Sequence, residues 1–270
     1  MTGRRSNQLS YYPEQREFEI NKNYPAQVKE QGFLWTGFFI SWFINLGETN
    51  SLDKQVRMNT LCCRKLELGP ISTNAFLLWE ENGSEAVLID CPPLGGSEIT
   101  DLLSKNNLQL KEIWFTHGHW DHIAGTREIF TSEIKLLGHQ ADQVLFETPE
   151  LMSSFSLPDL ILEPVHITDW IQEGSTLSLW GREVSILHCP GHCPGNVAFY
   201  LESENICFVG DVIFAGSVGR TDLPGGNFDD LTHSIRNKIY TLPDETELAV
   251  GHGPNTTVGK EKFSNPYVRA

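Results

Sequence analysis

Three histidines and one aspartate fall within six residues of this 270-residue chain, in the stretch 116–122 (THGHWDH). The stretch directly follows the short apolar run IWF, which predicts a strand that ends in a loop. In such a loop His117 and His119 can converge on one cation, while Asp121 and His122 turn the other way and can serve a second. Imidazole and carboxylate ligands suit zinc, iron and related metals. We therefore predict a metal site and reject a merely histidine-rich surface loop, because matching residues follow downstream.

Three further candidate ligands each stand in a turn directly after a predicted strand. His192 lies between two Pro-Gly pairs (PGHCPG), which restrict the backbone where a ligand must point inward. Asp211 follows the run CFVG, where a carboxylate oxygen can bridge two cations, and His252 follows the run LAVG. Any one of these could be an ordinary turn residue. Because all of them share the same placement just past a strand, we expect them to form one site.

Several other polar residues each allow two interpretations of their role. Asp90, at the end of a predicted strand, either orients the metal loop or starts a turn. In the loop 219–226, Arg220 either meets a substrate carboxylate or pairs with Asp222 to staple the loop, and Asp222 alternatively supports a ligand histidine. The remaining candidates are interpreted as surface, capping or small loop residues and not as ligands: His139, His166, His188, His233, Cys189 and Cys193.

Composition limits the function classes. The chain has 20 basic and 35 acidic residues and a formal charge of −15, which argues against nucleic acid as a partner because such binding depends on Lys and Arg. The six cysteines are scattered and not spaced as a disulfide scaffold, so we expect a reducing, cytoplasmic location. The length allows one large α/β domain with an appendage.

The first part of the chain differs from the rest. We expect residues 1–58 to be a poorly structured extension that contains an apolar aromatic segment, 33–46. This segment is shorter than the roughly 20 residues that span a bilayer, so a membrane helix is not expected. It is interpreted as an interfacial anchor, as a segment that docks on the main domain, or as upstream sequence if Met58 is the true start.

Residues 59–270 are expected to form the main domain. Short apolar runs separated by Gly-Pro and Asn-Gly turns predict a β-meander over residues 62–90 and a second set of strands over residues 176–209. Helical spacing predicts helices over 97–107 with a Ser97 cap, 124–130, 140–147 and 228–240. This alternation predicts sheets with helices packed outside them.

The candidate ligands, taken in order along the chain, resemble those of the metallo-β-lactamase superfamily and, within it, the compact bacterial glyoxalase II-like hydrolases. The resemblance extends from about Met58 to the end and implies a four-layer αββα sandwich of two mixed sheets with helices outside. It implies two divalent metal ions, zinc first, with iron or manganese as alternatives. It would assign the ligands as follows: His117, His119 and His192 to one metal, Asp121, His122 and His252 to the other, and Asp211 to both.

The resemblance implies a thioester hydrolase in which Asp121 and Asp211 hold a metal-bridging hydroxide that attacks a small-molecule thioester. Glyoxalase II proper has a further C-terminal helical domain for glutathione, whereas this chain ends at Ala270, which leaves the thiol carrier open. The segment 219–222 (GRTD) is also similar to one in persulfide dioxygenases, which would bind a single iron through His117, His192 and Asp211. The third alternative is a metal-binding interaction protein without activity.

Overall fold

The computed structural model describes Phe18–Glu19 and residues 60–270. The predicted extension 1–58, its apolar segment 33–46 and the proposed start at Met58 therefore lie outside the described residues, except for Phe18–Glu19. This pair forms the short strand β1, which pairs antiparallel with Cys62 and Cys63. Of the expected main domain, 59–270, the structure describes the part from Thr60 onward.

Fourteen more strands follow β1 in the described residues. They are β2 (Leu61–Leu68), β3 (Thr73–Glu80), β4 (Glu85–Ile89), β5 (Gln109–Trp114), β6 (Lys135–His139), β7 (Asp169–Ile171), β8 (Thr176–Leu179), β9 (Arg182–His188), β10 (Val197–Leu201), β11 (Ile206–Gly210), β12 (Ile213–Phe214), β13 (Ser217–Val218), β14 (Glu247–Val250) and β15 (Thr256–Thr257).

The helices connect these strands. They are α1 (Gly96–Lys105), α2 (Trp120–Ile123), α3 (Thr126–Ile129), α4 (Gln143–Glu147), α5 (Phe228–Ser234) and α6 (Val258–Ser264), with the 3-10 turns η1 (Gln140–Asp142), η2 (Pro149–Phe155) and η3 (Glu202–Glu204) and the π-helical turn η4 (Ile235–Ile239). No helix among residues 60–270 combines the length and the apolar character needed to cross a bilayer.

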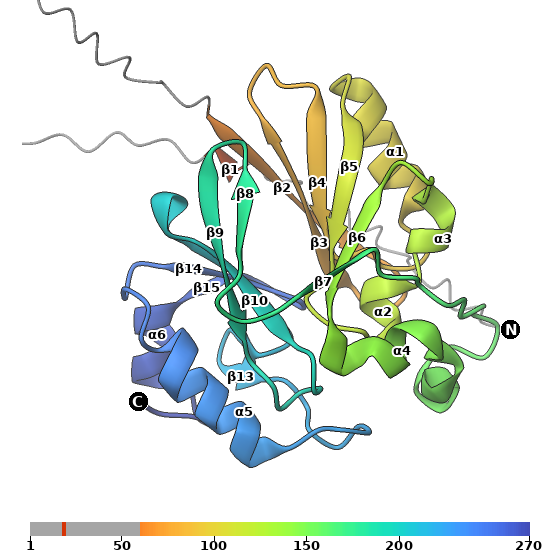
Figure 1. Ribbon diagram of the computed structural model, residues 1–270. Helices are drawn as coiled ribbons and strands as arrows, with labels where there is room; N and C mark the ends of the chain where they lie inside the picture. Colours follow the sequence, from red (N-terminus) through yellow and green to blue (C-terminus); the bar gives the residue numbers. More distant parts are fainter. Residues whose placement is uncertain (1–17, 20–59) are drawn as a thin grey trace, which may run out of the picture.

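Two mixed sheets pack face to face in the centre of the fold (Figure 1). The first has the order β1-β2-β3-β4-β5-β6-β7, antiparallel as far as β4 and parallel from β4 to β7. The second has the order β15-β14-β11-β10-β9-β8, in which only β11 and β14 are parallel. Helices α1 to α4 cover the outer face of the first sheet, and α5 and α6 cover that of the second (Figure 1). The predicted four-layer αββα sandwich is confirmed.

Alternating side chains on the strands supply the apolar contacts between these layers. On β3, Phe76 and Leu78 point into the core between the two sheets, whereas Ala75 and Leu77 point into the core under α1. On the second sheet, Phe208 joins the central core and its neighbour Val209 joins the core under α5 and α6. Each sheet thus buries both of its faces, which explains why central strands such as β10 and β11 are apolar throughout.

Several predicted boundaries differ from the observed ones. Helix α1 begins at Gly96 without a side-chain cap from its own sequence, and the carboxylate of Glu128 on α3 accepts the Gly96 N–H at 2.9 Å instead. Of the helix predicted over 124–130, only α3 (Thr126–Ile129) forms, and the short helix α2 (Trp120–Ile123) before it was not predicted. Gly125 lies between them with its N–H bonded to the Cys91 carbonyl, so close that a Cβ there would come within 2.1 Å of the Pro92 oxygen.

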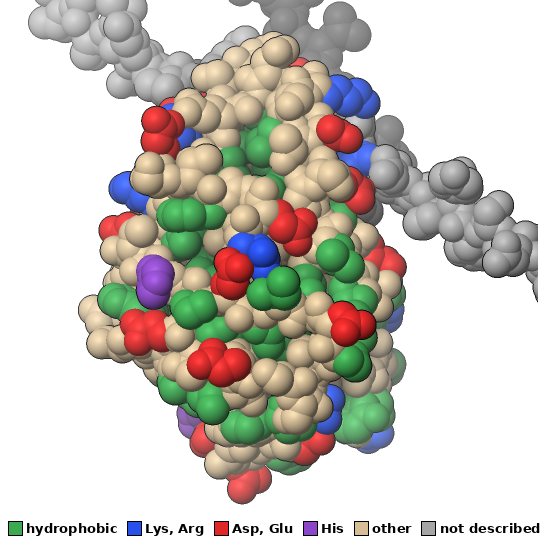
Figure 2. All heavy atoms as spheres, turned by 90° about the vertical axis from the view of Figure 1, so that its right-hand side faces the viewer, with side chains coloured by type: hydrophobic (Ala, Val, Ile, Leu, Met, Phe, Trp, Pro, Cys, Tyr) green, Lys and Arg blue, Asp and Glu red, His purple; other side chains and the backbone are tan. Residues whose placement is uncertain are grey.

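The face of the molecule over α3, α4 and η2 carries apolar side chains scattered among acidic ones (Figure 2). The exposed ones include Phe130, Val144, Leu151, Phe155 and Ile161. Below this face, Trp120, Leu145, Met152, Cys193 and Leu223 form a small buried cluster. The segment around η2 therefore packs onto the loops that carry the candidate ligands.

Candidate metal centre

All seven predicted ligands come together at one edge of the sandwich, although four separate segments supply them. Their ligand atoms form three overlapping groups, and within each group the atoms lie within 4.8 Å of one another. The groups are His117, His119 and His192; His117, His122 and Asp211; and Asp121, His122 and His252. The expectation that distant turns meet at one place is thus met by the fold.

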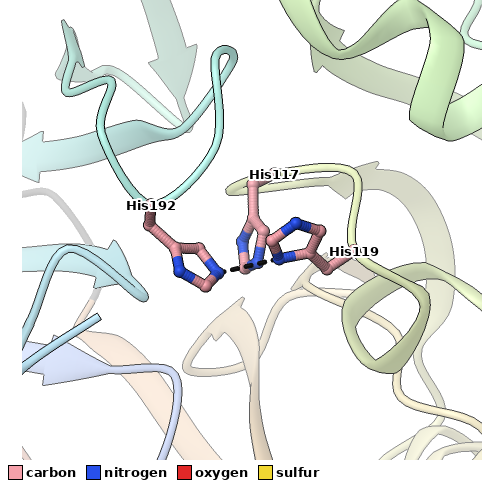
Figure 3. Close-up of side chains that lie close together, drawn as sticks. All are labelled: His117, His119 and His192. Carbon is pink, nitrogen blue, oxygen red and sulfur yellow. Dashed lines mark hydrogen bonds between the residues drawn. The ribbon is translucent and has the colours of Figure 1, made fainter. Parts of the chain in front are cut away.

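The first group consists of three imidazoles that converge from both sheets (Figure 3). His117 and His119 lie in the loop after β5, and His192 lies in the turn between β9 and β10. His119 Nδ1 is 2.8 Å from His192 Nε2, and all three side chains are buried. Three imidazole nitrogens that converge in this way are typical of a zinc or iron site.

The group of Asp121, His122 and His252, called the second group from here on, lies beside the first and adds a carboxylate. Asp121 Oδ2 is 3.2 Å from His252 Nε2 and 3.3 Å from His122 Nε2. Asp121 and His122 stand on the first turn of α2, while His252 follows β14. His252 is partly exposed, with 26% of its side chain accessible, so the site opens to solvent on this side.

Asp211, directly after β11, lies between the two groups. Its Oδ1 is 3.4 Å from His122 Nε2, and its Oδ2 is 3.6 Å from His192 Nε2 and 3.5 Å from His252 Nε2. One carboxylate therefore approaches histidines of both groups. This is the position that a ligand shared by two cations requires.

Several buried polar atoms of this cluster lack a hydrogen-bond partner, and they show whether a metal ion would fit the site. His117 Nε2, His122 Nε2 and Asp211 Oδ1 are buried and have no hydrogen-bond partner in the structure. A buried polar atom without a partner costs about 1–3 kcal/mol. Divalent cations accept lone pairs from these same atom types, and binding would satisfy all three. A fourth atom without a partner, His119 Nε2, belongs to the ring whose other nitrogen, Nδ1, faces His192. The donor set fits one or two divalent cations.

The pKa shifts of the histidines differ between the two parts of the cluster: they are downward for His117 and His119 and upward for His122. Burial and the neighbouring His122, His119 and His192 hold the pKa of His117 well below its usual value, and burial lowers the pKa of His119 to about 3. Both rings are therefore neutral, as metal ligation requires. Burial also opposes a charge on His122, but the carboxylates of Asp121, Asp90 and Asp211 outweigh it and raise its pKa well above normal. The acidic half of the site attracts positive charge.

Hydrogen bonds behind the ligands orient their rings. Asp90 Oδ2 lies 2.7 Å from His122 Nδ1, and the carboxylate also accepts the N–H and O–H of Thr116 at 2.8 Å each. His192 Nδ1 lies 2.8 Å from the carbonyl oxygen of Arg220. Such partners select the tautomer that points the other nitrogen at a metal. Of the two interpretations of Asp90, these contacts with Thr116 and His122 support the one in which it orients the ligand loop.

The loop that contains Arg220 forms the predicted staple. Arg220 and Asp222 make two parallel bonds of 2.7 Å, both side chains are largely exposed, and Asp222 makes no hydrogen bond to a ligand ring. The ion pair lowers the pKa of Asp222 to about 2. A contact between Arg220 and a substrate carboxylate stays a prediction.

The histidines that the sequence interpretation set aside lie outside the ligand groups. His139 caps η1 through the Ala141 N–H and stacks on His188 with ring centroids 4.1 Å apart. His188 bonds the Pro194 carbonyl, and His166 and His233 are exposed. Cys189 is buried in the core under α5.

Three residues near the site were not anticipated. Thr73 Oγ1 donates to Asp121 Oδ2 at 3.0 Å, and the buried Asp142 bonds both loops of the first group. Gly251 leaves room for the site, since a Cβ there would come within 2.1 Å of Asp211 Oδ1. Thr73 and Asp142 lie on other elements and have no local motif, whereas Gly251 stands beside a candidate ligand and could have been found.

Comparison with known proteins agrees with this geometry. The family model of the metallo-beta-lactamase superfamily matches residues 68–252. The hydroxyacylglutathione hydrolase GloC of Haemophilus influenzae is 35% identical over 214 residues, which cover 76% of this chain and 98% of that protein. The crystal structure of the BLEG-1 B3 metallo-beta-lactamase has a TM-score of 0.72 at 35% identity and covers 77% of this chain and 100% of that one. TTHA1623, solved in a di-iron-bound form, has a TM-score of 0.67 at 34% identity, with 76% and 99% coverage.

Proposed function

The chain belongs to the metallo-beta-lactamase superfamily and is a metal-dependent hydrolase, and from this premise we propose that it cleaves a small-molecule thioester at a site for two divalent cations. Hydrolysis of a thioester consumes one water and yields a carboxylic acid and a thiol. The proposed cations are zinc, with iron or manganese as alternatives, because all three accept imidazole and carboxylate ligands.

The observation that carries this proposal is the position of Asp211 between two complete ligand groups. Its two oxygens lie 3.4 to 3.6 Å from His122, His192 and His252. These distances join ring nitrogens of both groups to one carboxylate. A site for a single cation would not need the second group of Asp121, His122 and His252 within 4.8 Å of one another.

Each residue has a proposed role. When bound, two cations would supply a water of lowered pKa, from about 15.7 toward about 7, and would polarise the substrate carbonyl. We assign Asp211 to both cations. Asp121, whose Oδ2 accepts a hydrogen bond from the Thr73 hydroxyl at 3.0 Å, would orient the attacking water by accepting its hydrogen bond. The partly exposed His252 marks the side from which substrate enters.

The substrate class rests on chemistry and on a relative. No Gly-x-Ser-x-Gly nucleophile motif occurs in the chain, so an attack by water fits better than a serine acyl-enzyme. The GloC relative is named hydroxyacylglutathione hydrolase, which suggests a thioester of a small thiol such as glutathione. We propose that Arg220, largely exposed in its loop, meets a substrate carboxylate.

One sequence feature favours a second candidate, a mono-iron persulfide dioxygenase. The segment 219–222 (GRTD) resembles that class and lies beside the site, where the Arg220 carbonyl is 2.8 Å from His192 Nδ1. In that case His117, His192 and Asp211 would hold one iron. We favour the hydrolase because the second ligand group is complete.

Metal content and oxygen dependence distinguish the two candidates. Protein purified without added metal would be analysed for zinc, iron and manganese, and then assayed anaerobically with acyl-glutathione thioesters while the released thiol is measured. Two metals per chain with anaerobic thiol release support the hydrolase. One iron per chain, with oxygen consumed on a glutathione persulfide, would overturn it. A β-lactam in the same panel tests the activity in the name of the BLEG-1 neighbour, and no turnover of any substrate by metal-loaded protein would favour a non-enzymatic role.

A further inference from the structure

Asp142 is a fully buried carboxylate that the proposed hydrolysis does not use. It is the last residue of η1, directly after β6, and its exposed fraction is 0%. Among the described residues, no Lys or Arg forms an ion pair with it. Placing an unpaired carboxylate in the interior costs several kcal/mol unless hydrogen bonds compensate.

Three hydrogen bonds meet this carboxylate, and all come from the two ligand loops. Oδ2 accepts the Gly118 N–H at 2.9 Å and the Cys193 thiol at 3.1 Å. Oδ1 accepts the Gly195 N–H at 2.6 Å. Gly118 stands between His117 and His119 in the sequence, and Cys193 directly follows His192.

The two loops that Asp142 joins belong to different sheets. The first leaves β5 of the seven-stranded sheet, and the second connects β9 to β10 of the six-stranded sheet. The glycines are needed for the approach, since a Cβ on Gly195 would lie 2.5 Å from Asp142 Cγ and one on Gly118 would lie 3.2 Å from Asp142 Cβ. The carboxylate thus spans the junction at which His119 and His192 meet.

From these contacts we propose that Asp142 is a positioning residue for the three-histidine group. It holds the backbone between His117 and His119 and the turn just after His192, and so sets the separation of the His119 and His192 rings. Bonds to a charged acceptor are shorter and stronger than neutral ones, which makes a carboxylate suited to this task. The carboxylate makes no bond to Asp121, His122 or His252. Its effect is therefore confined to one of the two proposed cation sites, and the inference rests on that proposed assignment.

The decisive variant is Asp142→Asn, which keeps the shape of the side chain but turns one acceptor into an N–H donor. The new donor would face the Gly118 N–H if it replaces Oδ2, or the Gly195 N–H if it replaces Oδ1. Zinc affinities would be measured by competition with a chromophoric chelator, and His192→Ala and His252→Ala would identify which dissociation constant belongs to which group. We expect the constant of the three-histidine group to weaken about 10- to 100-fold, and the other to change less than about threefold.

The matched control is Glu204→Gln. Glu204 is a largely buried carboxylate that accepts the Arg182 Nε–H at 2.9 Å at the opposite end of β9 from the site. The same carboxylate-to-amide change there should leave both zinc constants at their wild-type values. Excess zinc should restore the turnover number of Asp142→Asn with an unchanged KM, because the variant alters metal retention and not substrate contact.

The inference is overturned if Asp142→Asn leaves both zinc constants within threefold of wild type, or weakens both equally. If that variant does not fold, amide exchange in the wild-type protein decides. The Gly118 and Gly195 N–H groups should exchange slowly. If either of them exchanges as fast as a surface amide, the proposed role of Asp142 is rejected. The milder variant Cys193→Ala removes one donor and should weaken the three-histidine group a few-fold, whereas no change would count against the proposal.

Failure of this inference differs from failure of the proposed function. Wild-type protein that binds two zinc ions but cleaves no thioester refutes the function and leaves the role of Asp142 intact. Unchanged zinc constants in Asp142→Asn, with thioester cleavage by the wild type, refute the inference alone.

Discussion

Asp90 Oδ2 lies 2.7 Å from His122 Nδ1, and both side chains are buried. The second nitrogen of the ring, Nε2, consequently faces Asp121 and Asp211 at 3.3 and 3.4 Å. The Asp90 carboxylate also accepts both the N–H and the O–H of Thr116. A single residue at the end of β4 therefore orients a ligand ring and anchors the start of the ligand loop.

Replacing Asp90 by Asn should weaken metal binding without unfolding the protein. Asp90 has a φ of +60°, which Asn tolerates almost as well. An amide has only one acceptor oxygen, however, so its NH₂ group would face a donor at one of the two oxygen positions and the side chain could not accept all three bonds from Thr116 and His122. We expect a loss of about 10- to 100-fold in metal affinity, measured by zinc competition. Asp101→Asn, an exposed change on α1, is the control, and equal affinities in the two variants would contradict this role.

Asp211→Asn and His192→Ala should each lower turnover by more than about 100-fold, because both remove a proposed metal ligand. The far-UV circular dichroism spectrum should stay close to that of the wild type, since the two side chains lie at the edge of the sandwich and not in its core. Metal analysis should show less than the full complement. Asp222→Asn, in the exposed staple, should keep turnover within a few-fold. Full activity of either ligand variant would contradict the proposed metal site.

Two glycines beside His252 form a matched pair. A Cβ on Gly251 would meet Asp211 Oδ1 at 2.1 Å and His122 Cε1 at 2.9 Å, whereas one on Gly253 meets no atom within 4 Å. Gly251→Ala should therefore displace both ligands and lose most metal affinity and activity. Gly253→Ala, at a φ of +74°, should cost about 1 kcal/mol of stability and retain the metal. Calorimetric metal titration and thermal unfolding separate these outcomes, and similar metal affinities in both would refute the steric argument.

Alkaline pH should destabilise the metal-free protein through its buried thiols. Burial raises the pKa of Cys189 from 9.0 to about 12. Above pH 9 the unfolded chain therefore binds fewer protons than the folded one, and the free energy of unfolding falls as pH rises, by up to about 1.4 kcal/mol per pH unit for this thiol. Urea unfolding between pH 8 and 10.5 should show a shallower decline in Cys189→Ala than in the wild type. Parallel declines would show that this thiol does not contribute.

The sequence alone identified the seven candidate ligands and the layers that hold them. Residue type and a turn just after an apolar run are local properties, so His192, Asp211 and His252 could each be selected without a structure. The alternation of strands and helices, with the resemblance carried by the ligand order, was enough for the αββα sandwich. Helix boundaries were predicted less well, because the start of α1 depends on Glu128 and the break before α3 on Gly125.

Only the tertiary structure decided which side chains support the ligands. Asp142 and Thr73 carry no motif, and their partners Gly195 and Asp121 lie 53 and 48 residues away in the chain. Such contacts arise where the two sheets pack together. A local pattern can mark a residue that is able to bind a metal, but the atoms that hold it in position come from distant segments, and their approach is determined by packing.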